Sequence, residues 1–223
     1  MSNKLLSCVE IKPEIAPVAT IIWLHGLGAD GHDFVSIVPE LHLPDNLPIK
    51  FIFPHAPERA ITINNGYVMR AWYDVKQLSG SFNDEDEPGI RESEKEICAL
   101  IENEKKLGMS SDKIILAGFS QGGAMALHTG LRYPEKLAGI IALSAYLPLA
   151  NLFLAEVSTV NQNLPIIMAH GTSDPLIPLM FAKASSDFLI QQGYQIDWHT
   201  YPMQHTVCSQ EIRDLSQWLQ RIC

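Results

Sequence analysis

Short runs of consecutive apolar residues alternate along the chain with longer segments whose apolar residues recur at helical spacing. Such runs are typical of strands buried on both faces, and they fall at 18–24, 49–53, 114–117, 137–143 and 165–170. An edge strand around 5–11 and an alternating strand at 195–201 complete the set. Helical spacing predicts helices at 32–41, 90–107, 181–190 and 212–222, and another from Ala124 onward. The alternation predicts an α/β fold whose mostly parallel central sheet has helices on both faces.

The sharpest junction in this pattern joins the strand at 114–117 to the helix that follows it. Only residues 118–122 (GFSQG) separate the two, which leaves no room for a loop. The spacing matches the nucleophile elbow G-x-S-x-G, in which glycines let strand and helix approach closely and the turn exposes the serine hydroxyl. Three fixed positions are a weak signal alone, but the strand before and the helix after supply the required context. The junction therefore predicts that Ser120 is a nucleophile.

Two further polar residues lie just beyond predicted strands. Asp174 follows the strand at 165–170, and His205 follows the strand at 195–201. The carboxyl ends of parallel strands share one edge of a sheet, so both residues can meet Ser120 there. Taken singly, an aspartate before a proline is a common turn residue, and a histidine can cap a helix. Their chain order, Ser, Asp, His, is that of an α/β-hydrolase triad, so we expect an acyl-transfer site.

Acyl transfer needs hydrogen-bond donors for the negative charge that develops on the substrate oxygen. The N–H of Gln121 follows the nucleophile directly, and the N–H of Leu27 lies in the glycine-rich segment after the strand at 18–24. We expect these two groups to form the oxyanion hole. The spacing of Gly26, Gly28 and Gly31 does not match a dinucleotide-binding loop, so a dinucleotide site is not expected.

Regular periodicity is lost between residues 61 and 86. Large apolar side chains, among them Met69, Trp72, Tyr73 and Leu78, occur there among glycines and polar residues. Long irregular segments are functional or disordered, and the large apolar side chains favour a segment that covers a pocket. The acidic run at 84–87 is interpreted as a solvated loop tip rather than a metal site, because adjacent carboxylates do not converge on one ion.

Composition narrows the remaining classes of protein. The 223 residues suffice for one α/β domain, and a net charge of −9 without a basic cluster argues against nucleic-acid binding. Glu10 and Lys12 interrupt the place of a signal-peptide core, and no stretch approaches the about 18 apolar residues of a membrane span. We therefore expect a cytoplasmic protein without a transmembrane segment. The four cysteines include no C-x-x-C pair, and reduced thiols are expected.

Several motifs, taken together and in order, resemble the acyl-protein thioesterase and carboxylesterase family of small α/β-hydrolases, also called the phospholipase/carboxylesterase family. The resemblance covers nearly the whole chain. Its motifs are residues 23–28 (WLHGLG), 53–57 (FPHAP), 72–74 (WYD), 118–123 (GFSQGG), His170 with Gly171, Asp174 with Pro175, and His205 with Cys208. The resemblance implies a single α/β-hydrolase domain over residues 1–223, the triad Ser120, Asp174 and His205, oxyanion donors at Leu27 and Gln121, and neither cofactor nor metal.

The resemblance also implies a serine carboxylesterase that hydrolyses acyl esters of short to medium chain length. Some family members cleave lysophospholipids or remove fatty acyl groups from protein cysteines, and self-association in the family implies a homodimer. Side chains expected to line the acyl groove, with core packing as the alternative for each, are Leu27, Trp72, Leu78, Leu147, Ile177, Leu179 and Met203. A hydrolase of another acyl substrate, such as a peptidase or lactonase, and a catalytically silent acyl-binding module remain open alternatives.

Overall fold

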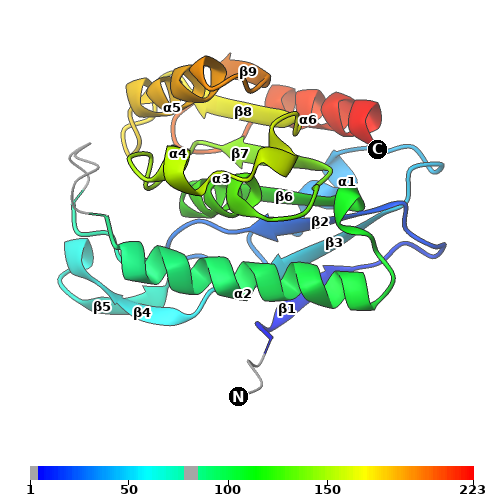
Figure 1. Cartoon of the computed structure of the whole chain (residues 1–223), viewed down its shortest axis with the longest axis horizontal. Helices are drawn as coiled ribbons and strands as arrows, with labels where there is room; N and C mark the ends of the chain where they lie inside the picture. Colours follow the sequence, from blue (N-terminus) through cyan, green and yellow to red (C-terminus); the bar gives the residue numbers. More distant parts are fainter. Residues whose placement is uncertain (1–4, 78–84) are drawn as a thin grey trace.

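A computed structural model describes residues 5–77 and 85–223 of the chain (Figure 1). Its strands are β1 (Cys8–Ile11), β2 (Ala19–Leu24), β3 (Ile49–Pro54), β4 (Glu58–Ile61), β5 (Tyr67–Arg70), β6 (Ile114–Phe119), β7 (Gly139–Leu143), β8 (Ile166–Gly171) and β9 (Ile196–Tyr201). Its helices are α1 (Ile37–Glu40), α2 (Glu87–Lys106), α3 (Gln121–Arg132), α4 (Phe153–Glu156), α5 (Leu179–Gln191) and α6 (Ser209–Ile222).

Seven of these strands form one sheet in the order β1-β3-β2-β6-β7-β8-β9. Every pair in it is parallel except β1 with β3, which is antiparallel. This confirms the mostly parallel sheet expected from the apolar runs. The central strand β6 lies between β2 and β7, and Ala117 faces Trp23 on one side and Ile141 on the other. The carboxyl ends of β2, β6 and β8 therefore open on the same edge of the sheet.

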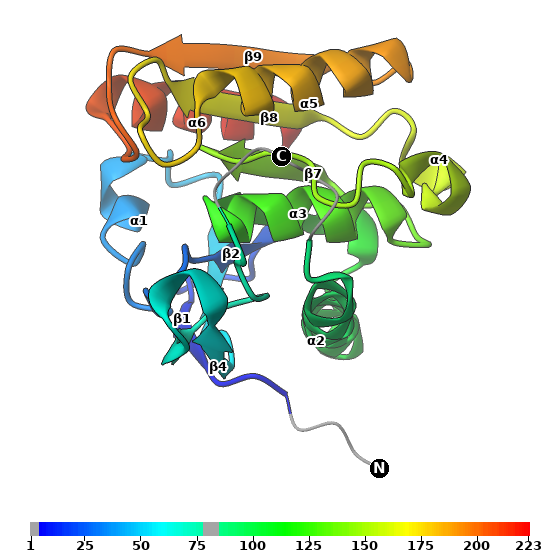
Figure 2. The same ribbon diagram turned by 90° about the vertical axis from the view of Figure 1, so that its left-hand side faces the viewer.

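Helices cover both faces of the sheet, as the alternating pattern predicted (Figure 2). One face packs against α2, α3 and α5 through residues such as Ile97, Leu127 and Leu189. The other face packs against α1 and α6, where Leu215 and Trp218 are buried. Successive residues of a central strand point to opposite layers, so β2 sends Ile22 to the first and Ile21 to the second. Burial on both faces explains why these strands are continuous apolar runs.

Two segments differ from the sequence expectation. Residues 32–36 are turns with hydrogen bonds three residues apart, and only Ile37–Glu40 form an α-helix. Pro39 carries no N–H, so it cannot donate the bond that a helix over 32–41 would require from it. Within the irregular region, β4 and β5 pair as an antiparallel hairpin. Asn65 and Gly66 adopt positive φ angles of 54° and 78° in its turn, and an Asn-Gly pair is a sequence signal for such a turn.

Helix α2 is capped at both ends. The side chain of Asp86 accepts the N–H of Gly89 at 3.2 Å, Pro88 stands in the first turn, and Gly108 follows the helix with a φ of 101°. Across residues 5–77 and 85–223, no helix combines the length and apolar character needed to cross a bilayer.

The first turn of α6 contains a buried carboxyl group that should make stability depend on pH. Glu211 is 1% exposed, and burial raises its pKa to about 8, against an opposing effect of the Cys208 amide. A raised folded-state pKa contributes stability that is full below the ordinary value of 4.5 and is lost as pH rises through about 8. A glutamine does not ionise, so the free energy of unfolding of Glu211→Gln should not show this loss. Relative to that of the native chain, we expect it to rise by roughly 2–4 kcal/mol between pH 5 and pH 9.

Thermal and urea unfolding at both pH values measure this difference. Glu14→Gln is the matched control, because Glu14 is exposed and should show no such gain. Parallel stability curves for Glu211→Gln and the native chain from pH 5 to pH 9 would contradict the assignment.

Candidate active site

Ser120 stands alone between the last residue of β6 and the first residue of α3. Its backbone has φ 56° and ψ −120°, a conformation that costs a residue with a side chain of the order of 1–3 kcal/mol. Hydrogen bonds hold it there: its N–H donates to the carbonyl of Leu143 at 2.8 Å, and its carbonyl accepts the N–H of Ala124 at 3.0 Å. This strained turn presents the Ser120 side chain to a cavity at the carboxyl edge of the sheet.

Glycines make that turn sterically feasible. A Cβ atom on Gly122 would lie 2.1 Å from the carbonyl oxygen of Leu24, and one on Gly118 would lie 2.3 Å from the carbonyl of Gly122. Neither neighbour can yield easily, because both contacts are with backbone atoms. The start of α3 therefore lies directly against β6, as the G-x-S-x-G spacing predicted, and also against the end of β2, which the spacing did not predict.

His205 and Asp174 are paired beyond the ends of β9 and β8. Nδ1 of His205 lies 2.6 Å from Oδ2 of Asp174, whose side chain is fully buried. The other oxygen, Oδ1, accepts the N–H groups of Leu176 at 2.8 Å and Ile177 at 2.9 Å. Three donors thus fix this carboxylate in one orientation, which in turn fixes the imidazole ring.

His170 supports the same aspartate from behind. Its Nε2 donates to the carbonyl of Ile177 at 2.8 Å and lies 3.4 Å from Oδ2 of Asp174. Burial lowers the pKa of His170, which favours the neutral ring and leaves the carboxylate facing a dipole rather than a second cation. The sequence motif contained His170, but its spacing gave no sign of this positioning contact.

A cavity of about 410 Å³ joins Ser120 and His205. Of the side chains predicted from the sequence, Leu27, Gln121 and Ile177 also line it. Among the described residues, no hydrogen bond links the Ser120 hydroxyl to His205, whose ring packs against Phe119 with centroids 4.7 Å apart. Asp174 lies behind the imidazole and does not line the cavity, so its contact with the site runs through His205.

Other predicted groove residues lie elsewhere. Trp72, Leu147 and Met203 are buried in the two core layers and do not line the cavity, which is the alternative that the sequence left open. Leu179 begins α5 half-buried and is likewise absent from the lining. Leu78 lies outside the described residues. Large apolar side chains next to a site often pack beneath it, because sequence reports burial but not which surface a residue covers.

A polar network behind the cavity was not apparent from sequence. The Gln121 side chain accepts the N–H of Trp72 at 2.7 Å and donates to the carbonyl of Tyr73 at 2.7 Å. The Trp72 indole donates to the carbonyl of His25 at 2.9 Å, and His25 accepts the N–H of Ala56 at 3.0 Å. These bonds tie α3, the segment after β5 and the loops after β2 and β3 into one support.

The glycine-rich loop that carries Leu27 is held by the hairpin. Gly28, at a φ of 79°, donates its N–H to the carbonyl of Arg70 at 2.9 Å, and the Arg70 guanidinium donates to the carbonyl of Ala56 at 2.8 Å. Gln121 is the first residue of α3, so its N–H precedes the helical hydrogen-bond ladder. Leu27 and Gln121, whose N–H groups are the expected oxyanion donors, both line the cavity that Ser120 also lines.

Several polar residues that sequence reasoning did not propose for the site also line the cavity, among them Tyr73, Tyr146 and Glu85. The hydroxyls of Tyr73 and Tyr146 lie 3.4 Å apart, and burial raises the pKa of both, that of Tyr146 to about 12. Glu85 accepts the N–H of Leu149 at 2.9 Å, and burial raises its pKa to about 7. Tyr73 lies in the WYD motif, and Glu85 lies in the acidic run at 84–87. The interpretation of that run as a solvated loop tip is wrong for two of its described residues, because Glu85 is half-buried in the cavity wall and Asp86 caps α2. The cavity wall thus combines apolar side chains with a polar group of two tyrosines and a glutamate.

Nearly the whole chain is similar to proteins of known family. The model of a family described as Phospholipase/Carboxylesterase matches residues 7–223. Acyl-protein thioesterase 1 of Yarrowia lipolytica is 38% identical over 216 residues, which cover 95% of this chain and 95% of that protein.

Solved structures agree with this match. The structure of Arabidopsis thaliana SOBER1 has a TM-score of 0.86 and 30% identity, covering 91% of this chain and 98% of that one. Zea mays acyl-protein thioesterase 2 has a TM-score of 0.86 and 27% identity, covering 96% of this chain and 98% of that one. The likenesses confirm both the family resemblance found in the motifs and the predicted α/β-hydrolase fold.

Substitution at the helix–strand contact tests how tightly the elbow is built. Gly122→Ala should destabilise the chain by about 1–3 kcal/mol or more, because the added methyl group meets the Leu24 carbonyl and outweighs the gain in helix propensity of about 1 kcal/mol. Gly130→Ala, on the same helix, serves as the comparison, because the added methyl group meets side-chain atoms of Ile140 at 2.6 and 2.9 Å and no backbone atom. Urea unfolding measures both, and equal stabilities of the two variants would disprove the steric account.

Proposed function

Because the chain belongs to the phospholipase/carboxylesterase family, we propose that it hydrolyses carboxylic esters and thioesters of acyl chains through an acyl-enzyme on Ser120. The membership itself confirms the predicted class, an enzyme that acts on ester bonds. The nucleophile, its partners and the substrates are the content of the proposal.

One observation carries it: a buried, multiply hydrogen-bonded carboxylate holds an imidazole at 2.6 Å beside a strained serine in a shared cavity. Positive φ at a serine is expensive, and Asp174 is kept in place by two main-chain donors. Strained conformations of this kind occur mainly at functional sites, where the strain is part of the geometry that the chemistry requires. A structural role alone for these residues would need neither the strain nor the cavity.

In the first half of the reaction, the Ser120 hydroxyl attacks the acyl carbonyl while His205 takes up its proton at Nε2. Asp174 stabilises the resulting imidazolium through Nδ1 and keeps the ring in the required tautomer. The N–H groups of Leu27 and Gln121 bind the oxyanion. The imidazolium then protonates the leaving alcohol or thiol, the bond to that group breaks, and the acyl group remains on Ser120.

In the second half, water replaces the leaving group. His205 removes a proton from the water as it attacks the acyl-enzyme, and the same oxyanion donors act again. The tetrahedral species collapses to the carboxylic acid, and the proton on His205 returns to Ser120. The substrate complex must close the distance between Ser120 and His205, as catalytic hydrogen bonds commonly do on substrate binding.

The cavity supports an acyl chain as the recognised part of the substrate. Apolar side chains from three regions face it: Ile63, Leu176 and Ile177, with Leu27 beside Ser120. Acyl esters, acylated proteins and lysophospholipids share such a chain and differ in the leaving group. We also propose that the chain is a single cytoplasmic domain over residues 1–223; homodimerisation stays a prediction, to be measured by sedimentation.

Removal of the carboxylate tests the triad directly. Asp174→Asn should keep the fold but lower kcat by about 10⁴, because the amide favours the wrong imidazole tautomer. Ser120→Ala should abolish both turnover and labelling by a fluorophosphonate. Hydrolysis of matched oxygen ester, thioester and lysophospholipid substrates gives the rates and shows which leaving group is preferred.

Asp197→Asn is the matched control, because Asp197 pairs with His199 at 2.7 Å outside the cavity. It should retain native turnover. Near-native kcat in Asp174→Asn would remove that residue from the triad. Folded native protein that neither reacts with the probe nor turns over any of the substrates would instead support a silent acyl-binding module.

Chain-length dependence tests the acyl cavity. Each added CH₂ should gain up to about 0.8 kcal/mol, roughly fourfold in kcat/KM, until the cavity is full. Ile177→Ala should flatten this slope, whereas Leu154→Ala on the exposed face of α4 should not. Kinetics over a series of acyl esters measure both, and the same kcat/KM for every chain length would refute an apolar acyl site.

A further inference from the structure

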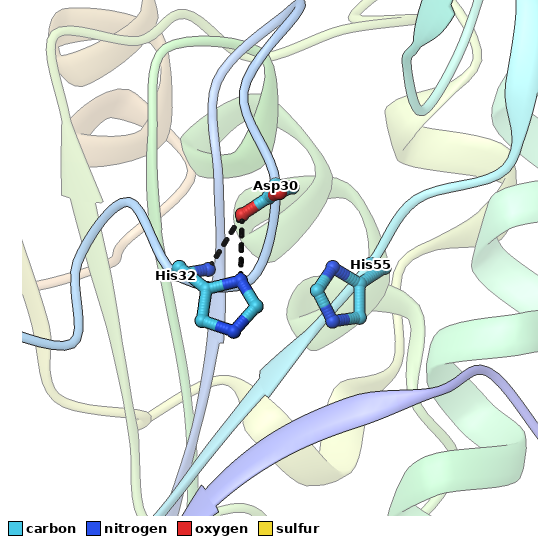
Figure 3. A group of neighbouring side chains, drawn as sticks. All are labelled: Asp30, His32 and His55. Atoms are coloured by element: carbon cyan, nitrogen blue, oxygen red, sulfur yellow. Dashed lines mark hydrogen bonds and ion pairs between the residues drawn. The ribbon is translucent and has the colours of Figure 1, made fainter.

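A second group of chemistry-bearing side chains lies near the glycine-rich loop. Asp30 and His32 belong to the segment after β2, and His55 follows the end of β3 (Figure 3). One ligand atom from each of the three lies within 4.8 Å of the others. The imidazole rings of His32 and His55 lie side by side, with centroids 5.3 Å apart and planes inclined at 51° (Figure 3). Neither histidine lines the cavity, and the proposed mechanism uses none of the three.

The backbone holds the two segments together. Gly31 donates its N–H to Nδ1 of His55 at 3.1 Å, and a Cβ atom on Gly31 would lie 2.4 Å from the carbonyl oxygen of Phe53. The main-chain N–H of His32 donates to Oδ1 of Asp30 at 2.8 Å. Close backbone contact therefore fixes the spacing between the loop and the end of β3, whichever way the exposed His32 ring turns.

The geometry of the ligand atoms suits a cation. Oδ1 of Asp30 accepts the main-chain N–H of His32 and lies 3.1 Å from Nδ1 of the same histidine. His55 places a ring nitrogen within 4.8 Å of both. Two ligands of one tetrahedral zinc ion lie roughly 3.3 Å apart, so the Asp30–His32 pair already has this spacing and His55 must approach by up to about 1.5 Å.

We propose that Asp30, His32 and His55 bind one divalent transition-metal ion of the zinc, nickel or copper type. Two imidazoles and a carboxylate are the ligands these ions prefer, whereas calcium and magnesium favour all-oxygen sites. The cation takes the place of the His32 ring proton that now lies on Oδ1 of Asp30. The other coordination positions face solvent, because the His32 side chain is 70% exposed.

Such a site connects the loop after β2, which lines the cavity, to the segment after β3, which is hydrogen-bonded to the support behind it. Ala29 and Asp33, on either side of the ligands, line the cavity, and Leu27 lies on the same loop. A bound ion fixes this loop to the end of β3 and binds only the folded chain. It therefore raises the unfolding temperature, by an amount that grows with the logarithm of the free ion concentration once this exceeds the Kd. This inference does not depend on the proposed hydrolysis.

The test titrates zinc chloride into the native chain and into His55→Gln and His32→Gln variants, with binding followed by calorimetry. Cobalt(II) absorption provides a second readout, because ligand-field bands report nitrogen and oxygen ligands. Native protein should bind one equivalent with a raised unfolding temperature, and each variant should bind at least about tenfold more weakly. The His32 side chain is exposed, so His32→Gln should fold like the native chain. Weaker zinc binding by this variant then reports the loss of a ligand rather than unfolding.

His199→Gln is the matched control, because Asp197 and His199 have the same two-residue spacing as Asp30 and His32, while residues 5–77 and 85–223 place no second histidine within ligand distance of them. It should bind zinc like the native chain. The four free cysteines are a competing source of zinc binding, so an added Cys223→Ser background removes the exposed thiol. Equal zinc affinity in native, His32→Gln and His55→Gln proteins, or no saturable binding at all, would overturn the proposal.

Discussion

The contact between the start of α3 and the end of β2 sets the geometry on which the rest of the site depends. A carbonyl oxygen of β2 occupies the position that a side chain at Gly122 would need. With no side chain there, only one residue separates the end of β6 from the start of α3. That residue, Ser120, takes a positive φ. Strain at one residue is held by burial of the whole of α3 against the sheet. The strained conformation is thus stabilised by packing rather than by the serine itself.

Loops rather than regular elements surround this turn, yet hydrogen bonds fix each of them. Gln121 reaches from α3 to the segment at Trp72, which reaches to His25 and so to the loop after β2. On the other side of the serine, Ile177 and Leu176 hold Asp174, which holds His205. Polar groups that are fixed before a substrate arrives need little reorganisation during a reaction, which is the physical basis for catalysis by a largely preformed site.

The opposite end of the sheet has a different arrangement. Lys50 and Glu104 form a buried ion pair at 2.7 Å, and Thr20 donates to the same carboxylate at 3.1 Å. Lys50 and Thr20 are second residues of β3 and β2, so this cluster lies at the amino ends of the strands. Breaking such a pair leaves a buried charge and typically costs about 3–5 kcal/mol. Polar groups at one end of the sheet therefore join strands to α2, while those at the other end surround a cavity.

Sequence alone determined the strands of the main sheet and most of the helices around it, the mostly parallel arrangement, and the sharp turn at Ser120, but not the β4–β5 hairpin or α4. Each depends on local constraints: apolar runs report burial on both faces, and glycines report where backbones touch. The positions of Asp174 and His205 after their strands followed from the same rules, because parallel strands share a carboxyl edge.

Tertiary structure alone decided which side chains face the cavity. Trp72, Leu147 and Met203 are as apolar as Ile177, but they pack in the core because neighbours distant in sequence cover them. Cavity residues such as Tyr146 and Glu85, and the group of Asp30, His32 and His55, likewise come from segments far apart along the chain. Periodicity reports that a residue is buried, whereas its partners depend on how separate elements pack, and only the folded chain contains that information.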